Sequence, residues 1–261
     1  MSEKITSSNL ENVVHKNIEI HDDLMQKTLY VRMYCNNMQV NSSAQLAFQL
    51  LKTYGLIQLP IENQYWSGAI FVKGNIRIPV INTALPRANQ YFAAWHEIYH
   101  LLFDAVSFVH VIDSDSIMEE RKAEYFASLM LLGNLMPYFM ELPEMDFTAK
   151  IFHCMDVFQA PYKAVLISLF ESAVKSENRK IMDEVKQYFD VEYPDLASRF
   201  KALGLDDTLV RPSNLVNLGF LQTKILAAQE REPNVRYHKE NAIFLQKVLR
   251  EISEMAGGTD G

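Results

Sequence analysis

Cysteine is scarce in this chain of 261 residues, which has only Cys35 and Cys154. Two cysteines cannot form a disulfide framework, and neither has the neighbours of a C-x-x-C metal site. Glycine and proline occupy nine positions each, too few for a collagen-like or low-complexity chain. With 49% apolar residues, the chain has enough material for a packed core.

Long apolar runs and an excess of positive charge are also missing. No apolar run reaches the ~18 residues that a membrane-spanning helix needs, and the first residues lack the basic and apolar regions of a secretory signal. The formal net charge is −7, whereas a general nucleic-acid binder would show a basic face. We therefore expect a cytoplasmic protein that contacts neither membranes nor nucleic acid directly.

Three short segments have strand character, at 56–59, 68–72 and 76–81, and Lys73-Gly74-Asn75 has the composition of a hairpin turn. Most of the remaining chain shows helical periodicity, including 87–103, 117–132 and nearly everything after residue 136. The pattern predicts an α+β fold that is mainly helical, with a small antiparallel three-stranded sheet beside the helix at 87–103.

The strongest chemical signal is the segment WHEIYH at 95–100, which contains H-E-x-x-H. At 3.6 residues per turn, His96 and His100 project from one face of a helix and can bind one divalent ion. Glu97 is offset by ~100° and is placed to take a proton from a metal-bound water. The flanks are almost wholly apolar, which indicates a buried helix in which these polar side chains need compensation.

A catalytic zinc site needs a third protein ligand and one open position. Glu120 lies twenty residues after His100, on the next predicted helix, and Glu124 is one turn further on. This spacing is similar to that of gluzincin peptidases, in which the first acid binds the metal and the second orients a ligand imidazole. The resemblance implies those roles for Glu120 and Glu124. The other candidate ligands downstream are His110 and Asp113, if the intervening loop folds back, and Asp115, Glu119 and His153, of which His153 is more typical of a core residue.

Taken together, these residues make the stretch 44–171 resemble the ImmA/IrrE family of metallopeptidases. The landmarks occur in order: a Tyr-Gly-Leu turn at 54–56, an Ile-x-Ile strand before 81–82, the H-E-x-x-H motif, and E-R-K-A-E-Y-F-A at 120–127. The last segment is similar to the family's E-x-x-A-[DN]-x-F-A helix.

The chain departs from the family pattern at three places. Tyr99 stands where the family usually has glycine, Glu124 replaces an aspartate or asparagine, and no arginine occurs near 167–168. The resemblance therefore implies the metal ligands of this chain more directly than it implies the family's substrate preference.

The resemblance implies an endopeptidase with one divalent ion, zinc or else manganese, that cleaves a helix-turn-helix repressor in a stress-response or mobile-element system. It assigns residues 42–175 to a metallopeptidase-like domain, with 1–41 unassigned and 176–261 as a helical extension. Two rival functions need the same ligands. One is a non-catalytic binding or sensor protein whose fold is stabilised by the metal, and the other is a peptidase-like toxin with a cognate partner.

Overall fold

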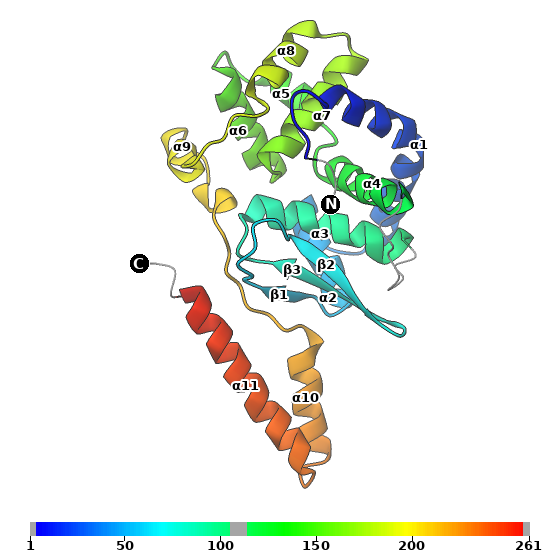
Figure 1. The fold of residues 1–261 in the computed structure, drawn as a ribbon, viewed down its shortest axis with the longest axis vertical. Coiled ribbons are helices and arrows are strands. Elements are labelled where there is room, and N and C mark those ends of the chain that lie inside the picture. The colour runs from blue at the N-terminus through cyan, green and yellow to red at the C-terminus, as the bar shows by residue number, and fades with distance from the viewer. Residues whose placement is uncertain (1–3, 105–113, 258–261) are drawn as a thin grey trace.

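The computed structural model describes residues 4–104 and 114–257, and most of them are helical (Figure 1). The predicted mainly helical α+β class is confirmed. In chain order, the elements are α1 (Leu10–Tyr34), α2 (Ser43–Thr53), β1 (Ile57–Leu59), β2 (Gly68–Lys73), β3 (Ile76–Asn82), α3 (Arg87–Phe103), α4 (Ser114–Leu131), α5 (Leu135–Glu141), α6 (Phe147–Phe158), α7 (Tyr162–Lys175), α8 (Arg179–Tyr188), α9 (Leu196–Ala202), the 3-10 helix η1 (Asp207–Val210), α10 (Phe220–Arg231) and α11 (Arg236–Gly257).

The sheet has the strand order β1-β3-β2 and is mixed rather than antiparallel. The predicted hairpin of β2 and β3 is present, with Gly74 at φ 59 in its turn, but β1 pairs parallel to β3. The prediction of a fully antiparallel sheet was therefore wrong. Residues 60–67 carry the chain past the position that β3 later fills, so that β3 enters between β1 and β2 in the direction of β1.

A buried asparagine holds that connection in place. Asn82 is fully buried, and its Oδ1 accepts a hydrogen bond from the backbone N–H of Ile61 at 2.9 Å. Its Nδ2 donates to the carbonyl oxygens of Ile61 at 3.0 Å and Trp66 at 2.8 Å. One side chain thus satisfies the backbone of a loop that has no ladder of its own.

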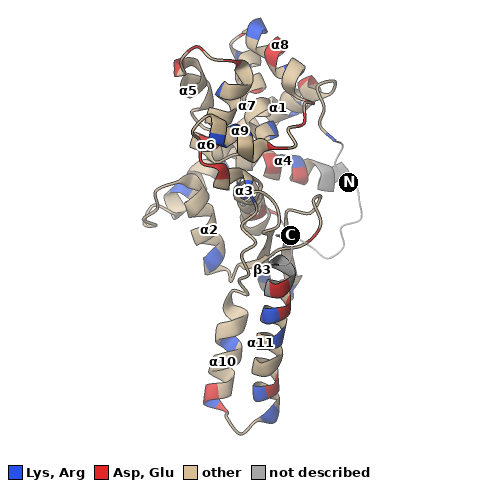
Figure 2. Cartoon of the chain, turned by 90° about the vertical axis from the view of Figure 1, so that its left-hand side faces the viewer, with Lys and Arg blue, Asp and Glu red and all other residues tan. Residues whose placement is uncertain are grey.

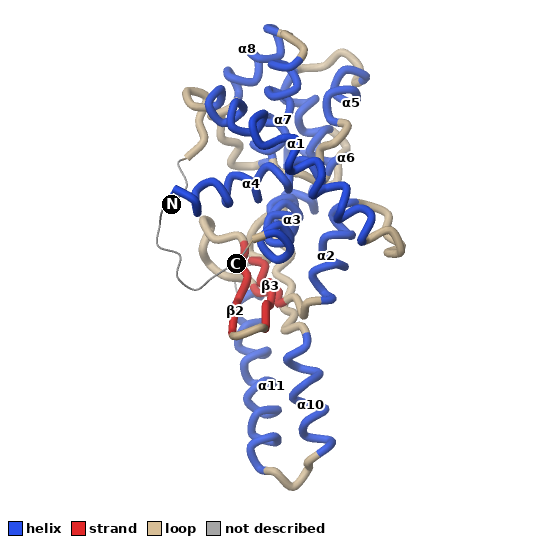
Figure 3. The backbone as a smooth tube through the Cα atoms, turned by 90° about the vertical axis from the view of Figure 1, so that its right-hand side faces the viewer, coloured by secondary structure: helices blue, strands red, loops and turns tan. Residues whose placement is uncertain are grey.

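Helix α3 lies between the sheet and α4 and forms the centre of the core (Figures 1 and 3). Trp95 and Tyr99 are buried, and both rings pack on Phe126 of α4, with centroid distances of 6.2 and 5.8 Å. At the C-terminal end of α3, Arg77 donates to the carbonyl oxygens of Leu101 and Asp104 at 3.2 and 3.3 Å. These contacts fix the helix that carries H-E-x-x-H relative to both neighbours.

Residues 1–41, which the sequence left unassigned, contribute α1, and α1 packs against α4 and α7. Part of its buried face is polar. Asn17 is 1% exposed and donates to Glu171 at 3.2 Å, and Tyr125 donates to the other oxygen of Glu171 at 2.5 Å. These buried polar residues weaken the apolar periodicity by which the helix would be recognised.

Beyond η1, residues 211–219 run along the outer edge of β1. Gln58 and Asn217 exchange backbone hydrogen bonds of 2.7 and 2.9 Å, and Asn214 donates to the carbonyl of Thr83 at 3.0 Å. The α10–α11 hairpin then extends away from the body, with charged residues along α11 (Figures 1 and 2). In residues 4–104 and 114–257, no helix combines the length and apolar character that a bilayer crossing requires.

Candidate metal centre

His96 and His100 of α3 and Glu120 of α4 converge on one point. The two Nε2 atoms are 3.1 Å apart, and Glu120 lies 3.3 Å from His96 Nε2 through Oε2 and 3.6 Å from His100 Nε2 through Oε1. Ligand atoms 2.0–2.1 Å from a tetrahedral zinc ion lie about 3.3 Å from one another. The spacing of the three side chains therefore fits a single small divalent cation.

The protonation of His100 suits metal binding. Its Nδ1 lies 2.9 Å from Asp104 Oδ2, and both side chains are largely buried. An ionised carboxylate only accepts hydrogen bonds, so it holds the ring proton on Nδ1 and leaves the Nε2 lone pair facing His96 and Glu120. Burial, aided by the charge of His96, lowers the pKa of His100 and keeps the ring in its neutral, ligating form.

The surroundings of His96 favour a positive charge at the same point. Burial acts to lower the pKa of His96, but the hydrogen bond to Glu120 and the charge of Glu97 outweigh it and raise the pKa. A divalent cation held by the three side chains would satisfy these carboxylates instead of a proton. The glutamate side of the group is open, because the Glu120 side chain is 52% exposed against 16% and 10% for the histidines.

Glu97 lies between this group and the sheet, since the charges of His96 and Glu120 both act on its carboxyl and Gly68 of β2 approaches it closely. It is 4% exposed, and a Cβ built on Gly68 of β2 would lie 3.0 Å from its Oε1 and 2.9 Å from the carbonyl oxygen of Val80. Glycine at position 68 therefore lets the strand approach the carboxylate closely. Burial raises the pKa of Glu97 to about 7, against a smaller opposing effect of His96. A carboxyl with such a pKa can both accept and release a proton near neutral pH.

Glu124 pairs through Oε2 with Arg121 Nη1 at 2.9 Å on the same helix, and its charge also acts to raise the pKa of His96. Its predicted role of orienting a ligand imidazole stays a prediction. The carboxylate that contacts a ligand imidazole is Asp104, which the sequence analysis missed. The signal available for it was an aspartate four residues after His100, hence one turn further along α3.

The remaining candidate ligands lie elsewhere. Glu119 accepts hydrogen bonds from Tyr99 at 2.7 Å and Lys122 at 2.6 Å, and His153 belongs to α6, outside the convergent group. His110 and Asp113 lie outside the described residues, as does the side chain of Asp115. Among the described residues, the group that converges is therefore His96, His100 and Glu120.

The outer edge of β2 runs beside Glu97 and, in the described part of the chain, pairs with no strand. Asn82 donates to the carbonyl of Ser67 at 2.9 Å, which makes 67 and 82 a hydrogen-bonded pair of the antiparallel ladder. Since these pairs alternate, the backbone groups of Gly68, Ile70 and Val72 face the open edge. They can bind an extended peptide by strand addition.

We expect Asp104→Asn to weaken metal binding by about 10–100-fold, the usual cost of losing a carboxylate that orients a ligand imidazole. The amide can still contact the ring but no longer holds the proton on Nδ1 by charge. Competition titration with a chromophoric zinc chelator measures the effect. Asp190→Asn, on a carboxylate that accepts from Ser7 far along the chain, is the control and should bind as wild type does. Unchanged affinity in Asp104→Asn would remove Asp104 from the site.

Gly68→Ala should lower proteolysis by roughly 10- to 100-fold while metal content is retained. The added methyl group pushes on Glu97 and on the carbonyl of Val80, and misplacing a catalytic group by about 1 Å can cost about 100-fold. Gly133→Ala is a matched control, because its nearest neighbours would be 3.8 Å away. Cleavage rates and elemental analysis of both variants decide the matter, and full activity in Gly68→Ala would contradict this view of the β2 edge.

In a comparison with known proteins, no family model, no curated protein and no solved structure matches the chain.

Proposed function

We propose that the protein is a metal-dependent endopeptidase of the ImmA/IrrE type. The observation that supports this most is the placement of one ligand atom each from His96, His100 and Glu120 within 4.8 Å of one another, with buried Glu97 beside them. When bound, a zinc or manganese ion would polarise the scissile carbonyl and acidify a water molecule.

The residues of the chain supply the rest of the chemistry. Glu97 accepts the proton of the attacking water at its carboxylate and returns it to the leaving amine. Asp104 keeps the proton of His100 on Nδ1. The backbone groups of Gly68, Ile70 and Val72 hold the substrate extended beside Glu97.

The substrate class follows from the sequence resemblance. We propose a cytoplasmic helix-turn-helix repressor as the substrate, cut at one site in a linker or in a helix that can unfold. Strand addition requires an extended chain, so the cleaved segment should be locally unstable in the substrate. The protein itself would then act on DNA only through this partner, in accord with its net charge of −7.

Capture with Glu97→Gln tests this proposal. The variant keeps the binding surface but lacks the base, so it should co-purify with the intact partner, which mass spectrometry identifies and metal-loaded wild type then cuts. His153→Gln, on α6, should capture nothing because it leaves Glu97 intact. A captured partner that wild type leaves whole would favour a docking or toxin function. A cleaved partner without a DNA-binding fold would refute the repressor as substrate and retain the peptidase.

A further inference from the structure

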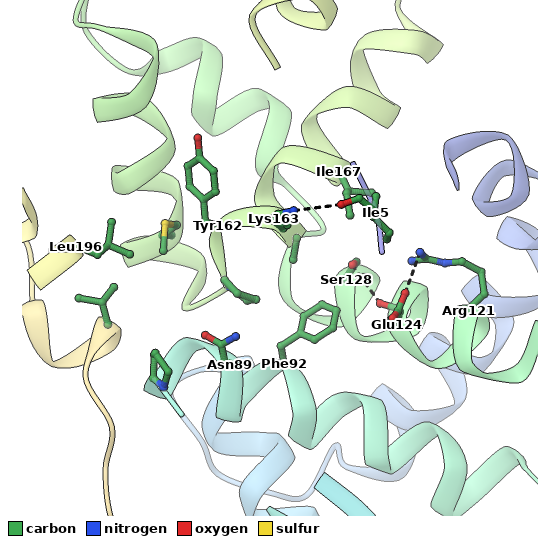
Figure 4. A pocket seen from close by; sticks show the side chains of 15 residues that line it. Ile5, Asn89, Phe92, Arg121, Glu124, Ser128, Tyr162, Lys163, Ile167 and Leu196 are labelled. Atoms are coloured by element: carbon green, nitrogen blue, oxygen red, sulfur yellow. Dashed lines mark hydrogen bonds and ion pairs between the residues drawn. The ribbon is translucent and has the colours of Figure 1, made fainter. Parts of the chain in front are cut away.

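A cavity of about 400 Å³ lies between α3 and α4 on one side and α6, α7 and α9 on the other (Figure 4). The volume lies within the range of sites for small molecules, about 300–1,000 Å³. The apolar part of the cavity wall is formed by Phe92, Met155 and Ile167. On the side of α9 and η1, it also includes Leu196 and Val210. The cavity belongs neither to the three converging ligands nor to the edge of β2.

The cavity shares two helices with the candidate metal centre. Phe92 lies one turn before His96 on α3, and Glu124 lies one turn after Glu120 on α4, and both line the cavity. Residues four apart lie on the same face of a helix. The two sites are therefore neighbours along one interface between α3 and α4, and Glu124 stands on their common border.

The polar part of the wall contains two cationic groups and one carboxylate, beside the uncharged side chains of Asn89, Ser128 and Tyr162. Arg121 is 12% exposed on its side chain, and its pair with Glu124 is the ion pair drawn in Figure 4. Within the described residues its buried Nε has no hydrogen-bond partner, so the guanidinium has donor capacity that these residues leave unused. Lys163 adds a second positive charge and donates to the carbonyl oxygen of Ile5 at 3.2 Å.

The start of α7 adds to this positive potential. The helix begins at Tyr162 after Pro161, which offers no side-chain cap, and both residues line the cavity. The positive end of the helix dipole therefore adds to Arg121 and Lys163. Two carboxylates oppose them: Glu124, which lines the cavity, and Glu171, whose charge also acts on Arg121. The positive charges in the wall favour an anionic ligand.

We propose that this cavity binds a small amphipathic anion, an apolar body carrying one carboxylate, which regulates the adjoining metal centre. The apolar body lies against Phe92, Met155 and Ile167, and the carboxylate pairs with Arg121 and Lys163. Because the ligand competes with Glu124 for Arg121, it releases Glu124 on the face of α4 that also carries Glu120, one turn away. The regulatory part rests on the proposed metal site, whereas the binding part does not.

Calorimetry with octanoate as the probe tests the binding. Octanamide has the same body without the charge and should bind about tenfold more weakly or worse, since a charge-assisted hydrogen bond is lost. Lys163→Gln should weaken octanoate binding and leave octanamide unchanged. Equal binding of the two probes to wild type would overturn the preference for an anion.

A pair of tryptophan substitutions locates the site. Leu196→Trp fills the cavity from α9 and should weaken octanoate binding by about tenfold or more. Leu203→Trp, at an exposed position just after the same helix and outside the cavity, should bind as wild type does. Octanoate binding that is unaffected by Leu196→Trp would place the ligand elsewhere and overturn the proposal.

Two further measurements identify the source of the carboxylate and test the coupling. An N-acetylated apolar tetrapeptide that binds tighter than octanoate, and loses binding when its C-terminus is amidated, assigns the site to a protein terminus. Tighter binding of octanoate assigns it to a free metabolite.

The coupling to the metal centre is tested by zinc titration. Saturating octanoate should raise zinc affinity about tenfold, because the released carboxylate of Glu124 can then hydrogen-bond a histidine that binds the metal. Unchanged zinc affinity would overturn the regulatory part. If the protein binds octanoate but does not bind zinc, the proposed function is refuted and the proposed cavity site is retained.

Discussion

Glu97→Gln is expected to leave the protein folded and metal-loaded and to lower proteolysis by about 10²–10⁴-fold, the usual contribution of a positioned base. Glutamine has nearly the same size and shape, but its amide cannot accept the proton. Because Glu97 is buried and burial already raises its pKa to about 7, a neutral side chain there carries no added desolvation cost. The cleavage rate of the captured partner and elemental analysis of the same preparation measure both halves of the expectation.

Glu230→Gln is the control for this experiment. Glu230 is exposed on α10, so the same chemical change there should leave both rate and metal content at the wild-type level. If Glu97→Gln cleaves as fast as wild type, the carboxylate is not the base. If neither Glu97→Gln nor wild type cleaves the partner that both bind, the metal has only a structural role and the protein acts by binding its partner.

His96→Ala should abolish the near-stoichiometric metal content expected of wild type purified without chelators. The substitution removes one of the three ligands, so the loss of affinity should exceed the roughly 10–100-fold that follows from changing a residue behind a ligand. Elemental analysis and competition titration measure it. His153→Ala removes an imidazole outside the converging group and should keep its metal.

Glu120→Gln examines the third ligand separately. The amide retains one oxygen of lower charge, so the metal should be held much more weakly than in wild type. Full retention of metal in this variant would show that Glu120 is not the third ligand, although His96 and His100 could still belong to the site. Loss of metal in both Glu120→Gln and His96→Ala, with retention in His153→Ala, would establish the three-ligand group.

The predicted parts of the site are those that follow from local geometry. His96 and His100 meet because they are four residues apart on one helix, and this spacing is set by the backbone. Glu97 is offset from His96 by about 100° around the helix for the same reason, and it is buried because the flanking residues are apolar. The β2–β3 hairpin likewise follows from two strand-like segments separated by a turn that contains Gly74.

Other features depend on which elements pack together, and these were missed or misplaced. The parallel pairing of β1 arises because β3 enters between its neighbours, which no segment of the sequence specifies alone. Helix α1 buries Asn17, whose partner Glu171 is 154 residues away in the sequence. By contrast, the contacts of Asp104 with His100 and of Glu124 with Arg121 join residues four and three apart, a spacing that is visible in the sequence.

The sequence by itself therefore determined the helix, its two histidines and its glutamate, because contacts within one helix repeat with a fixed period. The tertiary structure alone decided how closely Gly68 approaches Glu97, and that a cavity lined by Arg121, Lys163 and Glu124 adjoins the candidate metal centre. Each of these depends on the distance between side chains of different elements, and that distance is set by how the whole core packs.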